Sequence, residues 1–385
     1  MNDSLEKICN ISLSLGRGLG RGVLSLILLF SGFVKAVDPL GTQYKLQDYL
    51  EALGMGGMIA DWLLLGVSIA LSTMEFVLGV LLLFAISRRL VTKITLGMMV
   101  VMTCLTVWIY IANPVEDCGC FGDAIVLTNG QTLLKNIVLL ALAALLAWKP
   151  LRIKRFISLK WQWITYYTAV AFIIAVSAYS LYFLPLIDFR PYHIGANIKE
   201  KMSIPDGAPQ PEYKTTFIME KDGKRQEFTL ENYPDSTWTF IDSKTVQTSE
   251  GYVPEIPDLV IQDMRSGEDL TEQILSDEGL TLLLVSPHLE QASDAQFGEI
   301  DRLYEWAKEQ GISFYCLTAS GRQGIEQWID VTGAEYPFCN VDETTLKTMI
   351  RSNPGLMLLK AGTVIGKWSH NSLPSPDEII KLKNV

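Results

Sequence analysis

Five long apolar stretches occupy the first half of the chain and constrain its fold more than any other feature. A helix needs ~20 predominantly apolar residues to cross the hydrocarbon core of a bilayer. Stretches of about this length lie at residues 19–37, 59–86, 94–112, 132–148 and 164–187. No small-residue cleavage site follows the first of them, so we interpret it as an uncleaved transmembrane helix. The sequence predicts a multi-pass membrane protein with five spans.

The basic residues between these stretches set the expected orientation. Lys and Arg favour the cytoplasmic side of short loops. They gather before the first stretch (Lys7, Arg17, Arg21), between the second and third (Arg88, Arg89, Lys93), and between the fourth and fifth (Lys149, Arg152, Lys154, Arg155, Lys160). We therefore expect a cytoplasmic N-terminus. Five spans then place everything after Asp188 in the periplasm of a bacterial inner-membrane protein.

The second half of the chain has the composition of a soluble domain. The formal net charge is −10, and the acidic residues are concentrated after Asp188, which argues against nucleic acid as a partner. We expect a membrane domain at 1–150, a basic cytoplasmic loop and fifth helix at 151–188, and a linker with a β-hairpin at 189–253. The hairpin is predicted around Asp222-Gly223. The remaining residues, 254–385, form the predicted α/β domain.

Strand and helix patterns alternate in this last region. Short, fully apolar strands are predicted at 280–285 and 312–317, with an amphipathic helix at 293–310 between them. A second helix follows at 324–331, and a hairpin at 356–359 and 363–368. A βαβ unit followed by a hairpin predicts a mixed sheet with helices on both faces.

This order resembles the thioredoxin fold of TlpA-type and peroxiredoxin-type domains. The entry segment Ile256-Pro257-Asp258-Leu259 carries the resemblance, as does Pro354, which stands where that fold keeps a cis-proline. The family's C-x-x-C motif follows the first core strand, yet here that stretch begins Ser286-Pro287-His288 and contains no cysteine. The resemblance therefore implies the fold, with Pro287, His288 and Pro354 as landmarks, and not its thiol chemistry. A lone His288 is more often a surface or capping residue than a catalyst.

Two cysteines stand one residue apart in the expected outer loop between spans three and four. Cys118 and Cys120 lie in Asp117-Cys-Gly-Cys-Phe-Gly-Asp123. A disulfide over this spacing would be strained, hence oxidising and easily exchanged, and the glycines supply the necessary backbone freedom. One interpretation is a redox pair at the membrane surface. The other is a turn whose cysteines stay reduced or pair elsewhere. The outer loops of the bundle contain no histidine to complete a zinc site, so no metal is expected.

The remaining cysteines are expected to be unreactive. Cys9 and Cys104 are interpreted as inert thiols, and Cys316 as a small hydrophobe in a core strand. Cys339 is expected to be exposed. Whether Cys316 and Cys339 form a disulfide is left undecided, because the sequence does not fix the distance between them.

The membrane half resembles the DoxX/MauE family of four-helix membrane proteins, in the form found in Bacteroides-type bacteria. The segment from Leu29 to Pro39, Cys118-Gly-Cys-Phe-Gly122 and Asn136 carry the resemblance, over roughly residues 15–150. The methylamine-utilisation branch of this family accompanies thioredoxin-like partners. The resemblance therefore implies a role in extracytoplasmic redox maturation.

Glu75 lies in the middle of the second span, where a carboxylate is costly unless it faces a polar partner. It is either a proton or quinone site, or a neutral helix contact with Asn136, Thr103 or Thr106. The glycines at 16, 18, 20 and 22 are expected to mediate close helix packing.

Two functions remain open. In the first, Cys118 and Cys120 exchange electrons with an outer dithiol or a membrane quinone, and the degenerate thioredoxin-like domain docks an extracytoplasmic client or a thioredoxin-like protein. No other cofactor is evident. In the second, the chain is a non-enzymatic scaffold that binds partners. A transporter is a weaker third interpretation, with Glu75 as its only hint.

Overall fold

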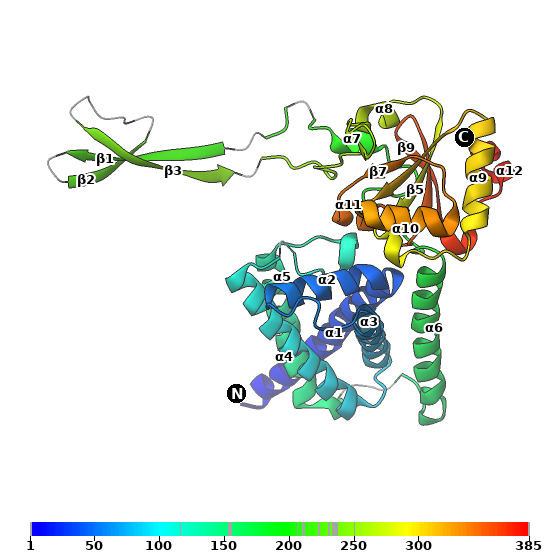
Figure 1. Cartoon of the computed structure of the whole chain (residues 1–385). Helices are drawn as coiled ribbons and strands as arrows, with labels where there is room; N and C mark the ends of the chain where they lie inside the picture. The colour runs from blue at the N-terminus through cyan, green and yellow to red at the C-terminus, as the bar shows by residue number, and fades with distance from the viewer. Residues whose placement is uncertain are drawn as a thin grey trace.

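Five helices of the structure are long and apolar enough to cross a membrane. The structure is a computed structural model that describes residues 2–383 apart from 116, 153–155, 206, 210–211, 222–223, 230–231, 233–237 and 250. The spanning helices are α1 (Asn2–Val37), α3 (Asp61–Leu83), α4 (Arg88–Ala112), α5 (Asn129–Trp148) and α6 (Gln162–Tyr182). The predicted spans are confirmed. In Figure 1 the first four pack together and α6 stands beside them, beneath the α/β domain.

A further helix, α2 (Pro39–Ala52), lies between the spans and the α/β domain (Figure 1). It begins at Asp38, whose carboxylate accepts a hydrogen bond of 3.0 Å from the backbone N–H of Gly41. Pro39 occupies the first helical position, where its missing N–H costs nothing. The sequence thus turns the chain sharply after span one and places α2 at the end of the bundle.

The close approach of α1 and α3 depends on two glycines inside the spans. A Cβ at Gly32 would lie 2.5 Å from the backbone nitrogen of Phe76, and one at Gly79 would lie 2.8 Å from that of Leu29. Small residues at such crossings let two backbones pack directly. The packing role predicted for the earlier glycine run holds only at Gly20, because a Cβ at Gly16, Gly18 or Gly22 would meet nothing within 4 Å. Gly20 alone of that run faces another helix, at Leu142.

The α/β domain is built on a six-stranded sheet of order β4-β7-β6-β5-β8-β9. The strands are β4 (Gln262–Asp263), β5 (Leu280–Ser286), β6 (Ser313–Thr318), β7 (Phe338–Asn340), β8 (Gly355–Lys360) and β9 (Thr363–Ser369). β5, β6 and β7 run parallel, and β4, β8 and β9 pair antiparallel to their neighbours. The helices are α8 (Thr271–Leu275), α9 (Phe297–Glu309), α10 (Arg322–Thr332), α11 (Glu343–Met349) and α12 (Pro376–Lys383).

This arrangement is thioredoxin-like, as expected. A parallel β5-α9-β6 unit is followed by the β8–β9 hairpin, and the Asn353–Pro354 peptide bond before β8 is cis. Alternating residues of the central strands fill two separate cores, one on each face of the sheet. β5 is buried at every position, because both of its faces are covered.

Cys316 and Cys339 lie on opposite faces of this sheet. Cys316 belongs to the core shared with Leu282 and Phe314, whereas Cys339 belongs to the core shared with Leu283 and Leu317. Both are free thiols with no exposed surface. A disulfide between them is therefore excluded by the period-2 alternation of the strands, and the expected exposure of Cys339 is wrong. Cys104 is a free thiol on α4, and the side chain of Cys9 lies outside the described residues.

The segment after span five was expected to be a linker, yet it packs into the α/β domain. Tyr192 and Ile198 are buried in one of the two cores, and the backbone N–H of Gly195 donates to Val364 at 2.7 Å. A short helix, α7 (Ile198–Met202), continues this contact. The segment after span five has the Pro and Gly content of a linker, but its few apolar side chains pack into the domain.

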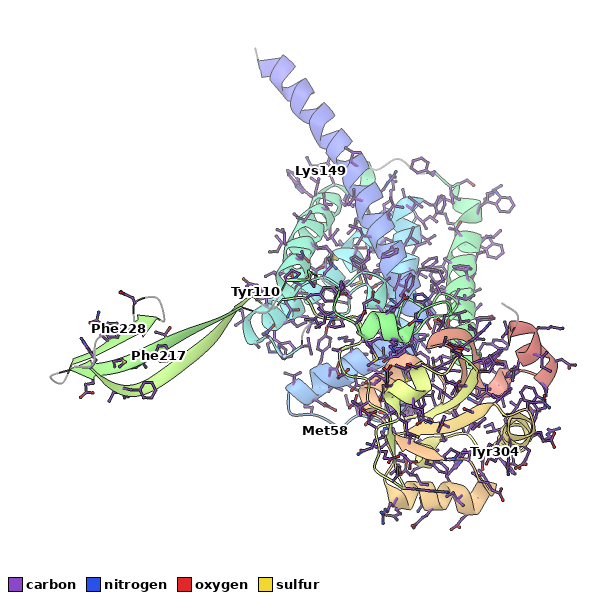
Figure 2. All side chains as sticks on the ribbon, turned by 90° about the horizontal axis from the view of Figure 1, so that it is seen from above. Met58, Tyr110, Lys149, Phe217, Phe228 and Tyr304 are labelled. Carbon is purple, nitrogen blue, oxygen red and sulfur yellow. The ribbon has the colours of Figure 1, made fainter. Side chains whose placement is uncertain are left out.

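A three-stranded antiparallel sheet projects away from both halves (Figure 1). Its strands are β1 (Glu212–Lys221), β2 (Lys224–Thr229) and β3 (Thr239–Ser249), in the order β2-β1-β3. The β1–β2 pair is the expected hairpin. Phe217 and Phe228 face each other across this pair and are labelled on the projecting sheet in Figure 2.

Candidate functional site

Cys118 and Cys120 lie in the loop between α4 and α5, with their sulfur atoms 2.8 Å apart. Both are free thiols. The backbone between and after them turns through left-handed conformations, at Gly119 (φ 60°) and Gly122 (φ 51°). Such angles suit glycine, as the sequence predicted. A disulfide bond measures about 2.05 Å, so a small displacement of either side chain would join the two sulfurs.

A buried polar cluster on α1 and α3 binds the Cys120 end of the loop. The Nζ of Lys35 lies 2.7 Å from Oε2 of Glu75, and it also donates to the carbonyl oxygen of Cys120 at 2.9 Å. The Ser31 hydroxyl lies 2.7 and 2.8 Å from the same two acceptors and donates its single proton to one of them. Opposite charges within a low-dielectric interior persist when each is paired and hydrogen-bonded. α1 and α3 thus jointly fix the position of Cys120.

Helix α2 holds the Cys118 end of the loop. The Tyr49 hydroxyl donates to the carbonyl oxygen of Cys118 at 2.6 Å. Lys45 forms an ion pair of 2.6 Å with Asp117, the residue before the first cysteine. The backbone of both cysteines is therefore anchored, while their sulfur atoms lie next to each other.

The two thiols differ in acidity. The hydrogen bond from Cys118 lowers the pKa of the Cys120 thiol to about 6. Burial raises this pKa, and the cations Lys135 and Lys35 lower it. The same hydrogen bond and burial raise the pKa of the Cys118 thiol. The two shifts favour the thiolate at Cys120 and the thiol at Cys118. A thiolate is the reactive form in disulfide exchange.

The sulfur pair borders a cavity of about 110 Å³ inside the bundle. Its walls come from α1, α2, α3, α4 and α5, and Glu75 and Asn136 both line it. The two do not touch. Asn136 donates to the Thr106 hydroxyl at 3.3 Å, whereas Glu75 bonds to Lys35 and Ser31. The expected contact of Glu75 with Asn136, Thr103 or Thr106 is therefore wrong.

The thioredoxin-fold landmarks face α2 of the bundle. Pro287, His288 and Asn353 line a cavity of about 490 Å³ whose other wall is α2. His288 pairs with Glu343 at 2.9 Å, and its carbonyl oxygen accepts a hydrogen bond from Asn353, next to Pro354. This is the face on which thioredoxin-like enzymes carry their motif, and here it offers no thiol.

The α/β domain is tied to the bundle by Arg351, three residues before Pro354. Its guanidinium contacts both oxygens of Asp38 at 2.9 and 3.0 Å, and lies 3.6 Å from Asp123 in the cysteine loop. Burial raises the pKa of Asp38, but the charges of Arg351 and Arg190 outweigh this effect and lower the pKa. A cavity of about 710 Å³ lies between the two halves and reaches Gly119 and Gly122 of the loop.

A second buried ion network joins the end of span five to the same domain. Asp188 pairs with Arg190 at 2.8 Å and with Lys367 of β9 at 2.6 Å. Burial and the neighbouring Arg190 lower the pKa of Lys367 to about 8, although Asp188 acts in the opposite direction. Two separate contacts therefore hold the α/β domain over the cysteine loop.

Sequence reasoning missed several residues of this site. They are Ser31, Lys35, Tyr49, Lys135 and Arg351. Lys35 was detectable, because it is a cation near the end of an apolar stretch and Glu75 is an anion within the next one. Such residues pair with one another in membranes. Nothing local to Arg351 or Tyr49 indicated their partners.

Two parts of the chain match known families. Residues 14–149 match the family described as methylamine utilisation protein MauE, so the membrane bundle is MauE-like, as the resemblance predicted. Residues 213–250, which hold the projecting sheet, match a domain of unknown function, DUF8463. No curated protein matches the chain.

Solved structures similar to the chain include two thioredoxin-like proteins. One, from Bacteroides thetaiotaomicron, is assigned as a protein disulfide isomerase, at 14% identity over 33% of this chain and 82% of that one, with a TM-score of 0.26. Another is Mycobacterium bovis AhpC, at 8% identity over 47% and 98%, with a TM-score of 0.21. These TM-scores are low, and the thioredoxin-like assignment follows from the strand order of the α/β domain itself.

Proposed function

We propose that this chain is a thiol–disulfide redox protein of the bacterial inner membrane, with Cys118 and Cys120 as its reactive pair. The α/β domain, which lacks a cysteine at the C-x-x-C position, serves as a docking module for an extracytoplasmic client. The chain is a multi-pass membrane protein with a MauE-like bundle and a thioredoxin-like domain, and the proposal assigns a role to each part.

The observation that carries this proposal is the paired sulfur atoms, 2.8 Å apart on an anchored backbone. Their carbonyl oxygens accept hydrogen bonds from Lys35, Ser31 and Tyr49, which leaves the thiols free to react. The hydrogen bond from Cys118 lowers the pKa of Cys120 to about 6. A low-pKa thiol beside a second cysteine is the usual composition of an exchange site.

The proposed orientation rests on the basic segments and on the geometry of the bundle. The N-terminus and the α/β domain lie at opposite ends of the spanning helices (Figure 1). If the Lys- and Arg-rich loops face the cytoplasm, the cysteine loop and the domain share the periplasmic side.

In the proposed exchange, a client thiolate attacks the Cys118–Cys120 disulfide. One sulfur of the pair leaves as a thiolate, and a mixed disulfide with the client forms. A second client thiolate then attacks that bond and releases the other sulfur. The client gains a disulfide, and two electrons pass to the pair, which ends as one thiol and one thiolate after it takes up a proton.

Purified protein in lipid nanodiscs, equilibrated with glutathione buffers, tests the proposal. Mass spectrometry should find a Cys118–Cys120 disulfide that forms and disappears reversibly. A bond across one intervening residue is expected to be strained, which predicts a potential above about −300 mV. Cys316 and Cys339 serve as internal controls and should stay reduced, since they lie on opposite faces of the sheet. A pair that stays reduced in every buffer contradicts the proposal.

The scaffold alternative is favoured by the thiol-free groove that faces α2. In that case the cysteines only shape the loop. A Cys118→Ser, Cys120→Ser variant that supports the same client maturation as the wild-type protein would favour this alternative.

A further inference from the structure

The two cysteines border the cavity inside the bundle and not the larger one beneath the α/β domain. Cys118 and Cys120 both line the 110 Å³ cavity. The 710 Å³ cavity between the halves is lined from the same loop by Gly119, Gly122, Asp123 and Val126, and by neither cysteine. The thiols are therefore turned toward the membrane interior. A reactant that occupies this cavity therefore lies beside both sulfur atoms.

The internal cavity is suited to a ring-sized apolar group. Its walls are mostly aliphatic and sulfur-containing side chains, among them Leu28 of α1, Met98 of α4 and Leu139 of α5. Sites for whole drug-sized ligands have volumes of about 300–1,000 Å³, so a cavity of about 110 Å³ has room for at most one ring. Leu71 and Met102, which also line it, are half-buried and lie on α3 and α4. A tail attached to the ring could leave toward lipid between these helices.

Three lysines line the cavity, and Lys135 is the one without an ionic partner among the residues described. Lys45 is paired with Asp117 at 2.6 Å. The ammonium of Lys35 already meets Glu75, Ser31 and the Cys120 carbonyl, which occupies its three donors. Lys135 differs, because its Nζ lies 4.2 Å from the ring centroid of Phe121 and has no carboxylate within ion-pair distance among the residues described. Lys135 can thus donate to an oxygen atom of a bound ring.

We propose that this cavity binds the ring of a lipid-soluble quinone, which accepts the electrons of the cysteine pair. The inference rests on the proposed function and names its electron acceptor. A membrane-embedded dithiol needs an oxidant that takes two electrons and two protons and that dissolves in lipid, and an apolar cavity with one hydrogen-bond donor fits such a ring. Lys135 donates to a ring carbonyl oxygen.

The reaction balances as follows. The Cys118 thiol and the Cys120 thiolate form a sulfur–sulfur bond and release two electrons and the Cys118 proton. The quinone takes both electrons, that proton and one proton from water, and becomes a quinol. The disulfide is then ready for the client.

Pre-reduced full-length protein in nanodiscs, mixed anaerobically with decylubiquinone, tests this inference. All ring carbons of that quinone are substituted, so it does not add thiols covalently. We expect one quinol per chain, followed by ultraviolet absorbance, with loss of the Cys118 and Cys120 thiols. Diamide, which oxidises dithiols without a binding site, serves as the parallel oxidant.

Two pairs of variants locate the reaction. Leu139→Phe fills the cavity and should slow quinone reduction on the order of tenfold, whereas Leu134→Phe, on the exposed face of the same helix, should not. Lys135→Met should raise the half-saturating quinone concentration about tenfold, as expected for a lost charge-assisted hydrogen bond. Lys149→Met, at the other end of α5, is its control. Oxidation by diamide should still be complete in all four.

The outcomes separate the two proposals. If diamide forms the Cys118–Cys120 disulfide and decylubiquinone does not, the quinone site is wrong and the proposed function stands. If neither oxidant forms it, the proposed function is wrong. Equal rates within both pairs of variants would place quinone reduction outside this cavity and overturn the inference. The Lys135 pair keeps the test decisive if Leu139→Phe fails to fold.

Discussion

Arg351, which is buried, forms a bidentate ion pair with Asp38 across 313 positions of sequence. Asp38 ends span one and caps α2, while Arg351 precedes the cis-proline of the α/β domain. The same guanidinium reaches Asp123 in the cysteine loop. A single side chain of the α/β domain thus contacts both the end of the first span and the candidate redox loop.

Replacing Arg351 should loosen the contact between the two halves. Arg351→Met leaves Asp38 buried without its main partner, which costs about 3–5 kcal/mol in comparable pairs. We expect a lower melting temperature in nanodiscs and faster proteolysis between α6 and β1. Arg302→Met is the matched control, because that arginine is exposed on α9. Identical melting and proteolysis of the two variants would contradict this role for the ion pair.

The Lys35–Glu75 pair should show strong coupling. Lys35→Met strands a buried carboxylate and Glu75→Gln strands a buried ammonium, so each single variant should lose about 3–5 kcal/mol. The double variant should recover part of this loss, since no unpaired charge remains. Thermal unfolding of all four proteins closes the double-mutant cycle. Simple additivity would show that the two side chains do not stabilise each other.

The reactivity of Cys120 should follow its lowered pKa. Because the thiolate is the reactive form, its alkylation by iodoacetamide should rise through about pH 6 and level off near neutrality. Cys118→Ala removes the hydrogen-bond donor, so the midpoint should move up toward ~8.5. Cys118→Ser retains a donor and should shift the midpoint less. Peptide mass spectrometry over a pH series gives both midpoints, and equal midpoints in the Ala and Ser variants would refute the hydrogen bond as the cause.

The glycines of span one should differ in their tolerance of a methyl group. Gly32→Ala places a Cβ against the backbone of α3 and should destabilise the bundle by about 1–3 kcal/mol. Gly22→Ala meets nothing within 4 Å and should be neutral or gain up to about 1 kcal/mol from helix propensity. Melting temperatures in one detergent decide between these outcomes. A stable Gly32→Ala variant would mean that α1 and α3 are not in direct backbone contact.

Local patterns predicted the elements of this fold well. The five spans depend only on the length of apolar runs, and the β5-α9-β6 unit depends on periodicity within short windows. The cis-proline at Pro354 was also expected, because it follows from the order of the elements. Such features need no knowledge of distant contacts.

The interactions of the site depend on distant contacts and were largely missed. Glu75 was identified, but its partner Lys35 lies 40 positions away on a different helix. The strand faces that separate Cys316 from Cys339 became clear only once the register of β6 and β7 was known. Tyr192 and Ile198 looked like parts of a linker, because a few scattered buried side chains in a polar segment give no periodic signal.

The redox state of Cys118 and Cys120 in living cells tests the central claim most directly. Cells grown under reducing and oxidising conditions are quenched in acid, and each cysteine is quantified by differential isotopic alkylation and mass spectrometry. We predict that Cys118 and Cys120 shift together between thiol and disulfide, while Cys316 and Cys339 stay reduced. Cysteines 118 and 120 that remain fully reduced under both conditions would contradict the account.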